Sequence, residues 1–106
     1  MNAVMSVTTN DFDTQVLQSS LPVLVDIMST HCPPCRMLAP VLEDLAAEFG
    51  GRVRIVQVNA DEDIEVAARY GVQATPTLLF FKGGKVVDQI LGAPSRSALV
   101  RKLETL

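Results

Sequence analysis

Two cysteines three positions apart are the residues of this chain best suited to chemistry. They stand in the run Cys32-Pro33-Pro34-Cys35, after an apolar segment and before a segment with helical periodicity. Side chains three apart in a helical turn face the same side, so the two sulfurs can bond to each other. Closing so short a loop removes little entropy from the unfolded chain, so this bond would be a poor structural staple. We therefore expect the pair to cycle between disulfide and dithiol.

The position of the pair favours a reactive first cysteine. A helix N-terminus presents unpaired N–H groups and the positive end of the helix dipole, and both stabilise a thiolate on Cys32. The thiolate is the nucleophile in disulfide exchange. Pro33 and Pro34 are tolerated there because the first helical positions have no intrahelical partner for an N–H. They also stiffen the ring and remove amide donors that could reach the Cys32 sulfur.

Two other interpretations of the cysteine pair stay open. The first is a pair of buried thiols without a function. The second is a zinc site, which takes about four ligands, whereas the chain offers only Cys32, Cys35 and its sole histidine, His31. His31 adjoins Cys32 in the sequence and is poorly placed to complete a tetrahedron. We expect neither a metal nor a bound cofactor.

Composition limits the class of protein. With 106 residues, 48% of them hydrophobic and 20% charged, the chain has the size of one domain and enough apolar content to fold. We expect residues 1–106 to form that single domain. The net charge of −3 and the lack of a basic stripe argue against nucleic acid as the main partner. No apolar run approaches the roughly 20 residues that cross a bilayer, so no membrane is expected either.

The first nine residues, Met1–Thr9, bear on the compartment. They lack a basic stretch followed by a continuous apolar stretch, so they do not resemble a secretory signal. On this ground we expect a cytoplasmic protein. Structural disulfides are rare in the cytoplasm, where a close cysteine pair more often does redox chemistry or binds metal.

Hydrophobic patterning places the cysteine pair within an α/β protein. We expect strands at 4–7, 21–28, 52–58, 77–81 and 86–91, and helices at about 8–19, 33–49, 61–70 and 95–106. The strand-helix-strand units require parallel, right-handed crossovers, whereas Gly83-Gly84 marks a hairpin that adds an antiparallel edge. Thr8 or Asn10 is the expected N-cap of the first helix, and Ser95 that of the last. The pattern predicts an α/β sandwich with a mixed sheet.

An ordered series of motifs makes essentially the whole chain resemble the thioredoxin family. The motifs are Val25-Asp26, the Cys-X-Pro-Cys run, Pro40 in the following helix, Val58-Asn59-Ala60-Asp61, Tyr70-Gly71-Val72, Ala74-Thr75-Pro76-Thr77, Phe81-Lys82-Gly83-Gly84-Lys85 and Gly92-Ala93. The resemblance implies a thioredoxin fold, with a five-stranded mixed sheet flanked by four helices. It also implies dithiol–disulfide oxidoreductase activity, and a Pro76 that is cis and faces the cysteines.

Three residues are expected to carry the chemistry. Cys32 would attack a substrate disulfide, and Cys35 would then resolve the mixed disulfide. Asp26 is a carboxylate inside an apolar strand, where burial would raise its pKa and let it take the proton of Cys35. The alternative for Asp26 is a side chain that reaches water or a backbone donor.

Four further residues are expected to bind the substrate. Thr75 and Pro76 would supply a main-chain edge that pairs with an extended substrate peptide. Gly92 and Ala93 would complete a shallow apolar docking surface beside that edge.

Five positions around the site depart from the usual thioredoxin residues. Thioredoxins usually have tryptophan at the positions of Met28 and His31, glycine at Pro33, and lysine at Arg36 and Gln57. We interpret the group as a retuned site. His31, as imidazolium, would stabilise the Cys32 thiolate, or else would only replace a surface aromatic residue. Arg36 would favour the thiolate modestly or be a plain surface cation, and Gln57 leaves Asp26 with no evident cation nearby.

The sequence therefore predicts a thioredoxin-like oxidoreductase that reduces disulfides in protein substrates. A flavoprotein thioredoxin reductase is the expected electron donor, and the protein is expected to act as a monomer. Two alternatives are a non-catalytic binding subunit with the same fold, and a thiol oxidant or isomerase with a less reducing potential. Retention of both cysteines and Asp26 disfavours the first, and the lack of a signal-like segment disfavours the second.

Overall fold

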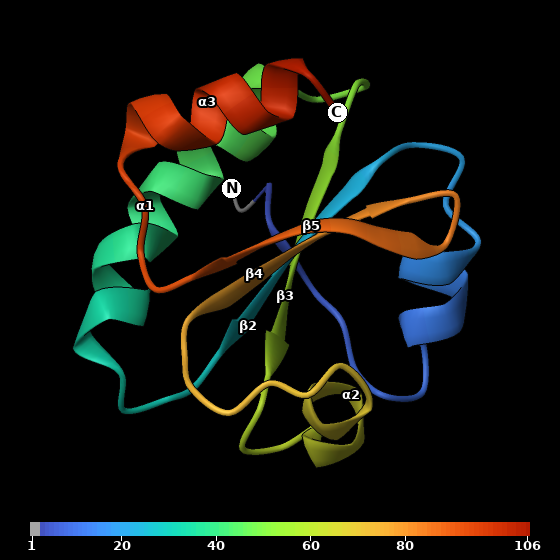
Figure 1. The fold of residues 1–106 in the computed structure, drawn as a ribbon, viewed down its shortest axis with the longest axis vertical. Helices are drawn as coiled ribbons and strands as arrows, with labels where there is room; N and C mark the ends of the chain where they lie inside the picture. Colours follow the sequence, from blue (N-terminus) through green and yellow to red (C-terminus); the bar gives the residue numbers. More distant parts are fainter. Residues whose placement is uncertain (1–2) are drawn as a thin grey trace.

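The structure is a computed structural model that describes residues 3–106. Met1 and Asn2, the first two residues of the segment Met1–Thr9, lie outside the described residues. The chain forms a five-stranded sheet in the order β1-β3-β2-β4-β5, with helices on both faces (Figure 1). The strands are β1 (Met5–Ser6), β2 (Val23–Met28), β3 (Arg54–Asn59), β4 (Thr77–Lys82) and β5 (Lys85–Leu91). The helices are the π-helix η1 (Asp13–Leu17) and the α-helices α1 (Pro33–Glu48), α2 (Ile64–Arg69) and α3 (Arg96–Glu104).

The sheet is mixed, as the sequence predicts. Strands β1 and β2 run parallel to β3, whereas β4 runs antiparallel to β2 and β5 antiparallel to β4. Strand β2 is central and buried along nearly its whole length, which explains its continuous apolar sequence. Asp26 in β2 is in register with Gln57 of β3 on one side and Leu78 of β4 on the other. The central strand therefore carries a carboxylate into the middle of the sheet.

Helices cover the two faces of the sheet and divide the core into two apolar layers (Figure 1). The layer under η1 and α2 holds Phe12, Val16, Val23, Val25, Ile27, Val66 and Phe81, among others. The layer under α1 and α3 holds Leu24, Leu38, Leu42, Leu45, Leu78, Leu99 and Leu103, among others. Side chains alternate along a strand, so Asp26 points to the same face as Leu24, which α1 covers. Helix α1 also carries Cys35 in its first turn.

The first helix differs from the prediction. Helix η1 spans Asp13–Leu17 rather than about 8–19, and neither Thr8 nor Asn10 caps it, since its N-cap is Phe12. The Asp11 carboxylate accepts hydrogen bonds from the Thr8 backbone N–H at 2.7 Å and from the Thr8 hydroxyl at 3.0 Å. These local bonds compete with a helix and hold this segment as a turn. Fully buried Phe12 then packs against Tyr70 and Phe81.

The remaining helices lie close to their predicted places. Ser95 caps α3, as predicted, because its hydroxyl accepts the Ala98 backbone N–H at 3.2 Å. Helix α2 begins at Ile64, later than predicted, because Asn59 holds the start of that segment as a turn. Helix α1 continues through Pro40 without interruption. Across residues 3–106, none of the helices combines the length and apolar character that a membrane crossing requires.

Candidate active site

Cys32 and Cys35 form a disulfide at the N-terminus of α1, with their Cα atoms 5.2 Å apart. The two residues are 5% and 4% exposed, so burial does not distinguish their roles. Their positions do distinguish them. Cys32 is the N-cap of α1 and has extended backbone angles, whereas Cys35 lies in the first helical turn. Cys32 is therefore the sulfur that faces the helix N-terminus.

The sulfur of Cys32 has two close backbone neighbours. The Cys35 backbone N–H donates to Cys32 Sγ at 3.2 Å, and the Thr75 carbonyl oxygen lies 3.6 Å from the same sulfur. Pro33 and Pro34 occupy the first two positions of α1 and have no N–H, so the Cys35 amide is the first helical donor to reach the sulfur. A donated hydrogen bond and the helix dipole both favour a thiolate on Cys32 once the disulfide is reduced.

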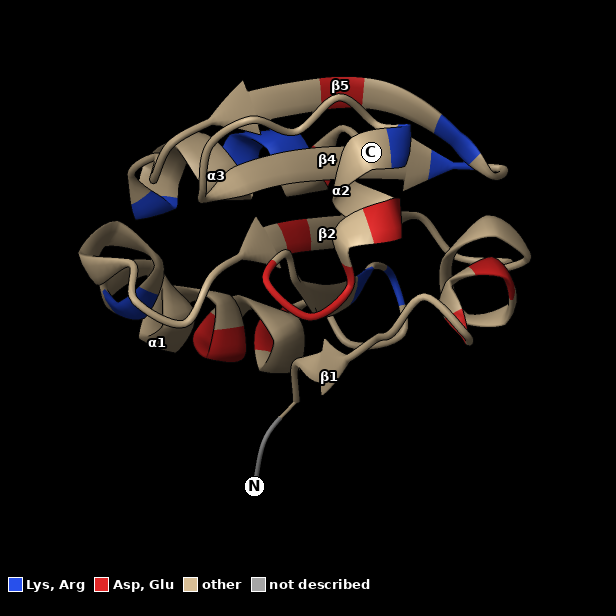
Figure 2. Ribbon diagram, turned by 90° about the horizontal axis from the view of Figure 1, so that it is seen from below, with Lys and Arg blue, Asp and Glu red and all other residues tan. Residues whose placement is uncertain are grey.

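Asp26 is a buried carboxylate whose pKa is raised to about 7 by desolvation. The residue is 3% exposed, and its Oδ1 atom accepts no hydrogen bond from any residue in 3–106. Figure 2 shows an acidic band within β2, whose only acidic residue is Asp26. A carboxyl with a pKa near 7 is populated in both protonation states at neutral pH, which suits an acid or base in catalysis.

A small cavity connects Asp26 with the disulfide. Its volume is about 80 Å³, and it is lined by Asp26, Met28, Ser29, Thr30, Cys35, Arg36, Ala39 and Gln57. Asp26 and Cys35 therefore line one cavity.

Gln57 lies beside Asp26 but turns its amide elsewhere. The two residues are in register on β3 and β2, and both line the same cavity. The Gln57 Nε2 group donates to Ser6 Oγ on β1 at 3.0 Å. Gln57 therefore brings neither a positive charge nor, by this donation, a hydrogen bond to the carboxylate.

His31 and Arg36 are both exposed beside the cysteines. The His31 side chain forms no hydrogen bond or ion pair within residues 3–106. Arg36 lines the cavity that Asp26 and Cys35 share, and its backbone N–H donates to the Cys32 carbonyl at 3.1 Å. In the described part of the chain, no group of three or more His, Cys, Asp and Glu residues is placed to hold a metal ion.

The segment that precedes β4 forms the other wall of the site. The Thr75–Pro76 peptide bond is cis, as the resemblance implies, and Pro76 is buried. The Gly92 backbone N–H donates to the Pro76 carbonyl at 2.8 Å, and the positive φ of Gly92, 86°, suits a residue without a Cβ. Ala93 follows Gly92 and is exposed. The structure therefore brings Thr75 to the disulfide, with Pro76 next in the chain, Gly92 hydrogen-bonded to Pro76, and Ala93 at the surface.

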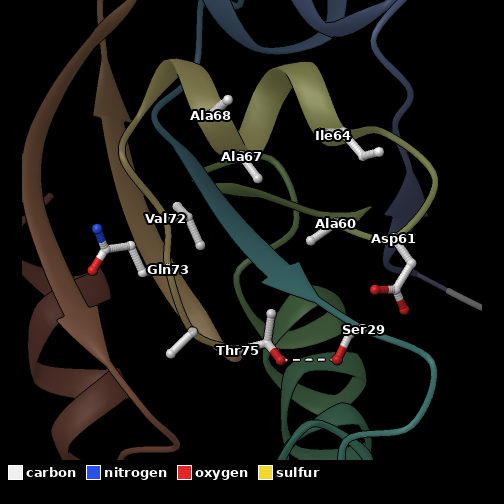
Figure 3. A pocket seen from close by; sticks show the side chains of 10 residues that line it. Ser29, Ala60, Asp61, Ile64, Ala67, Ala68, Val72, Gln73 and Thr75 are labelled. Atoms are coloured by element: carbon white, nitrogen blue, oxygen red, sulfur yellow. Dashed lines mark hydrogen bonds between the residues drawn. The ribbon is translucent and has the colours of Figure 1, made fainter.

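Sequence reasoning missed Ser29. Its hydroxyl oxygen lies 2.8 Å from Thr75 Oγ1, and both residues line an open hollow of about 370 Å³ beside α2 (Figure 3). The available signal was a hydroxyl residue directly after the apolar strand 21–28 and close before Cys32. Spacing alone gave no reason to pair it with position 75.

The fold and the site together define a protein of dithiol–disulfide exchange. A disulfide between cysteines three positions apart begins a helix, lies against a cis-proline segment and shares a cavity with a buried carboxyl group. Comparison with known proteins agrees. The thioredoxin family model matches residues 3–105.

Curated relatives match nearly the full chain. Thioredoxin 1 of Nostoc sp. is 44% identical over 104 residues, which cover 98% of this chain and 97% of that protein. Thioredoxin of Synechocystis sp. is 42% identical with the same coverage. The chloroplastic M-type thioredoxin of Pisum sativum is 39% identical over 98% of this chain and 60% of that protein. The chain belongs to the thioredoxin family, has the thioredoxin fold, and is a thiol–disulfide oxidoreductase that acts by dithiol–disulfide exchange.

Proposed function

We propose that residues 1–106 form one thioredoxin domain that reduces protein disulfides, with Cys32-Pro33-Pro34-Cys35 as its redox-active motif. The observation that carries the proposal is the environment of Cys32 Sγ. This sulfur caps α1, accepts the Cys35 N–H at 3.2 Å and lies 3.6 Å from the Thr75 carbonyl oxygen. The first contact favours the thiolate, and the second supports a role for the Thr75 main chain in binding the substrate beside the sulfur.

The proposed reaction moves two electrons from the dithiol to the substrate. The Cys32 thiolate attacks one sulfur of the substrate disulfide, so a Cys32–substrate bond forms and the other substrate sulfur leaves as a thiolate. Cys35 then loses its proton to Asp26 and attacks Cys32 Sγ. This step forms the Cys32–Cys35 disulfide and releases the second substrate sulfur. The substrate is reduced, and the protein is left oxidised, as in the structure.

The residues around the cysteines take supporting roles in this proposal. His31 and Arg36 add positive charge near the Cys32 thiolate, and Gln57 leaves Asp26 without a neighbouring lysine. Pro33 and Pro34 stiffen the disulfide ring. The substrate chain lies along Thr75 and Pro76, beside Gly92 and Ala93.

Thioredoxins act on disulfide substrates and are typically reduced by a thioredoxin reductase. We extend both statements to this chain, with disulfide-containing proteins as substrates and a flavoprotein reductase as electron donor. We further propose a monomer, with neither nucleic acid nor a membrane among its partners. The Cys32–Cys35 disulfide must be reduced again after each turnover, which requires a reducing compartment, and we propose the cytoplasm.

A trapping experiment tests the residue roles. Reduced Cys35→Ser protein, mixed with insulin, should accumulate a mixed disulfide at Cys32 that dithiothreitol releases, because the resolving sulfur is missing. The matched Cys32→Ser protein should form none. Trapping by both variants alike would contradict the assignment of the nucleophile. Partner binding that survives Cys32→Ser together with Cys35→Ser would instead indicate a binding subunit.

The reduction potential tests the direction of electron flow. Equilibration of the Cys32–Cys35 couple with glutathione should give a potential near the reducing end of the range for such proteins, at about −270 mV. A value near about −120 mV would make the protein an oxidant. A value near about −180 mV would favour an isomerase.

A further inference from the structure

One side-chain hydrogen bond joins the loop that carries Cys32 to the segment that carries cis-Pro76. Ser29 Oγ and Thr75 Oγ1 lie 2.8 Å apart, and Figure 3 shows the two hydroxyls pointing toward each other. Ser29 directly follows β2, three residues before Cys32, and Thr75 directly precedes Pro76. Both residues are half-buried. The bond therefore spans the two walls of the active site.

The same threonine also approaches the reactive sulfur. Its carbonyl oxygen lies 3.6 Å from Cys32 Sγ, so Thr75 meets the Cys32 loop through its side chain and through its main chain. Only two residues separate Ser29 from Cys32. Thr75 is therefore held to the segment 29–32 at two points, and the Ser29 hydroxyl fixes the distance between the Thr75 main chain and the Cys32 sulfur.

The Cys32 loop has a separate anchor of its own. The Thr30 backbone N–H donates to Asp61 Oδ2 at 3.2 Å, and Asn59 Nδ2 donates to Thr30 Oγ1 at 3.1 Å. These bonds tie the loop to the end of β3 and to the turn that follows it. Without the Ser29 hydroxyl, the bonds of Thr30 therefore still hold the Cys32 loop, whereas the Thr75 side chain loses its hydrogen bond to that loop.

Packing does little to restrain Thr75 on its other side. The segment that leads to it is tied to α2 at Val72, whose N–H donates to the Ala67 carbonyl at 2.9 Å, and then borders an open hollow of about 370 Å³ up to Thr75 (Figure 3). The backbone is held on both sides of Thr75, because the Thr77 hydroxyl donates to the Ala74 carbonyl at 2.7 Å and the Pro76 carbonyl accepts the Gly92 N–H. The Ser29 hydroxyl thus holds Thr75 where packing leaves space.

We propose that Ser29 is a positioning residue for the substrate-binding edge, which it sets against Cys32 through its hydrogen bond to Thr75. The inference rests on the proposed function, since it concerns the edge along which a substrate peptide would pair. The ligand class is an extended peptide segment that flanks a disulfide. A small disulfide without a flanking peptide makes no use of the edge and is insensitive to Ser29.

The test compares two substrates across hydroxyl-removing and hydroxyl-retaining variants. Ser29→Ala and Thr75→Val remove the bond, whereas Thr75→Ser retains it and Ser19→Ala removes a half-buried serine hydroxyl at the other end of β2. The substrates are insulin, with dithiothreitol as electron source, and the small aromatic disulfide DTNB, which is mixed with pre-reduced protein freed of dithiothreitol so that the Cys32–Cys35 dithiol supplies the electrons. Ser29→Ala and Thr75→Val should each lower kcat/KM for insulin by about two- to tenfold, through KM, as expected for one lost hydrogen bond.

The other variants serve as controls. Ser19→Ala should reduce insulin normally, and Thr75→Ser should recover most of the activity that Thr75→Val loses. Ser29→Ala should reduce DTNB normally, and the Ser29→Ala/Thr75→Val double variant should lose no more than either single one. Equal losses on both substrates, additive losses, or failure of Thr75→Ser to retain activity would each overturn the proposal. An active wild type with an unaffected Ser29→Ala would overturn this inference alone. A wild type that reduces neither substrate would overturn the proposed function itself.

Discussion

Asp26 shows how one residue is tuned by its neighbours. It lies on a buried strand between β3 and β4, and Gln57, its neighbour in register, directs its amide to Ser6. Burial therefore acts on the carboxyl without a compensating charge, and its pKa rises to about 7. The same burial destabilises the ionised carboxylate, so the buried position of Asp26, which suits proton transfer, should lower the free energy of unfolding when Asp26 is ionised.

This cost predicts a pH-dependent effect of Asp26→Asn. The native pKa, about 7, lies above the ordinary value of 3.8, so the folded state favours the protonated carboxyl. The stability that this preference contributes is present below about pH 4 and is lost as pH rises through about 7. Relative to Asp26→Asn, which cannot ionise, the wild type should lose up to about 4 kcal/mol over this interval. Urea unfolding of the oxidised proteins at several pH values measures the difference.

Asp88 supplies a control of opposite sign for that experiment. The hydrogen bond from the Lys102 side chain lowers the pKa of Asp88, so its contribution is present above its ordinary pKa and lost as pH falls. The deficit of Asp88→Asn should therefore shrink in acid. A stability difference between Asp26→Asn and the wild type that does not change with pH would contradict the raised pKa of Asp26.

The charge of His31 should also affect the reactivity of Cys32. Its exposed imidazole adjoins Cys32, and while protonated it should stabilise the thiolate. His31→Ala should raise the pKa of the Cys32 thiol, because the substitution removes a positive charge that stabilises the thiolate. His31→Lys should restore it. Ultraviolet absorbance of the thiolate during a pH titration measures the shift, and an unchanged curve would leave His31 as a surface residue only.

Among the elements, those with local causes were predictable and those with distant causes were not. The disulfide joins residues three apart, and the strands are apolar runs bounded by turn residues, so both could be predicted from spacing. The first helix was predicted too long because the bonds of Asp11 and the burial of Phe12 decide its start. The Ser29–Thr75 bond joins residues 46 apart, and its geometry depends on the folded sheet.

The hairpin turn between β4 and β5 packs closely against η1. Its turn is Gly83-Gly84, and both residues have positive φ, as tight hairpin turns require. A Cβ on Gly84 would lie 2.9 Å from the Leu17 carbonyl oxygen of η1, whereas a Cβ on Gly83 would meet no atom within 4 Å. The turn is thus in close contact with η1 at Gly84 only.

Gly84→Ala should therefore destabilise the protein more than Gly83→Ala. Each substitution places a side chain at positive φ, which costs about 1–2 kcal/mol. Gly84→Ala adds the backbone clash with Leu17, so its loss of unfolding free energy should be the larger. Urea denaturation compares the two variants directly. Equal losses would mean that the hairpin and η1 are not held together at this point.

The whole molecule has two apolar layers, one on each face of the sheet, and the sheet separates them. Tyr70, the only tyrosine in a chain without tryptophan, packs on Phe12 and Phe81 in the layer under η1 and α2. Helix α1, the longest helix, covers the opposite layer. Tyrosine fluorescence therefore reports on one layer, whereas far-ultraviolet circular dichroism reports on all the helices and is weighted toward the longest, α1 and α3, which cover the other layer.

If residues 3–106 fold as one unit, a change in one layer should be felt equally by both probes. Leu99 is fully buried in the layer under α1 and α3, so Leu99→Ala should lower the unfolding free energy by about 2–5 kcal/mol. Because each strand of the central sheet contributes side chains to both layers, the tyrosine and dichroism midpoints in urea should move together. Val87→Ala, at an exposed position of edge strand β5, should move neither by much. A Leu99→Ala protein whose dichroism midpoint falls while the Tyr70 midpoint stays would show two layers that unfold separately, and would contradict a single domain.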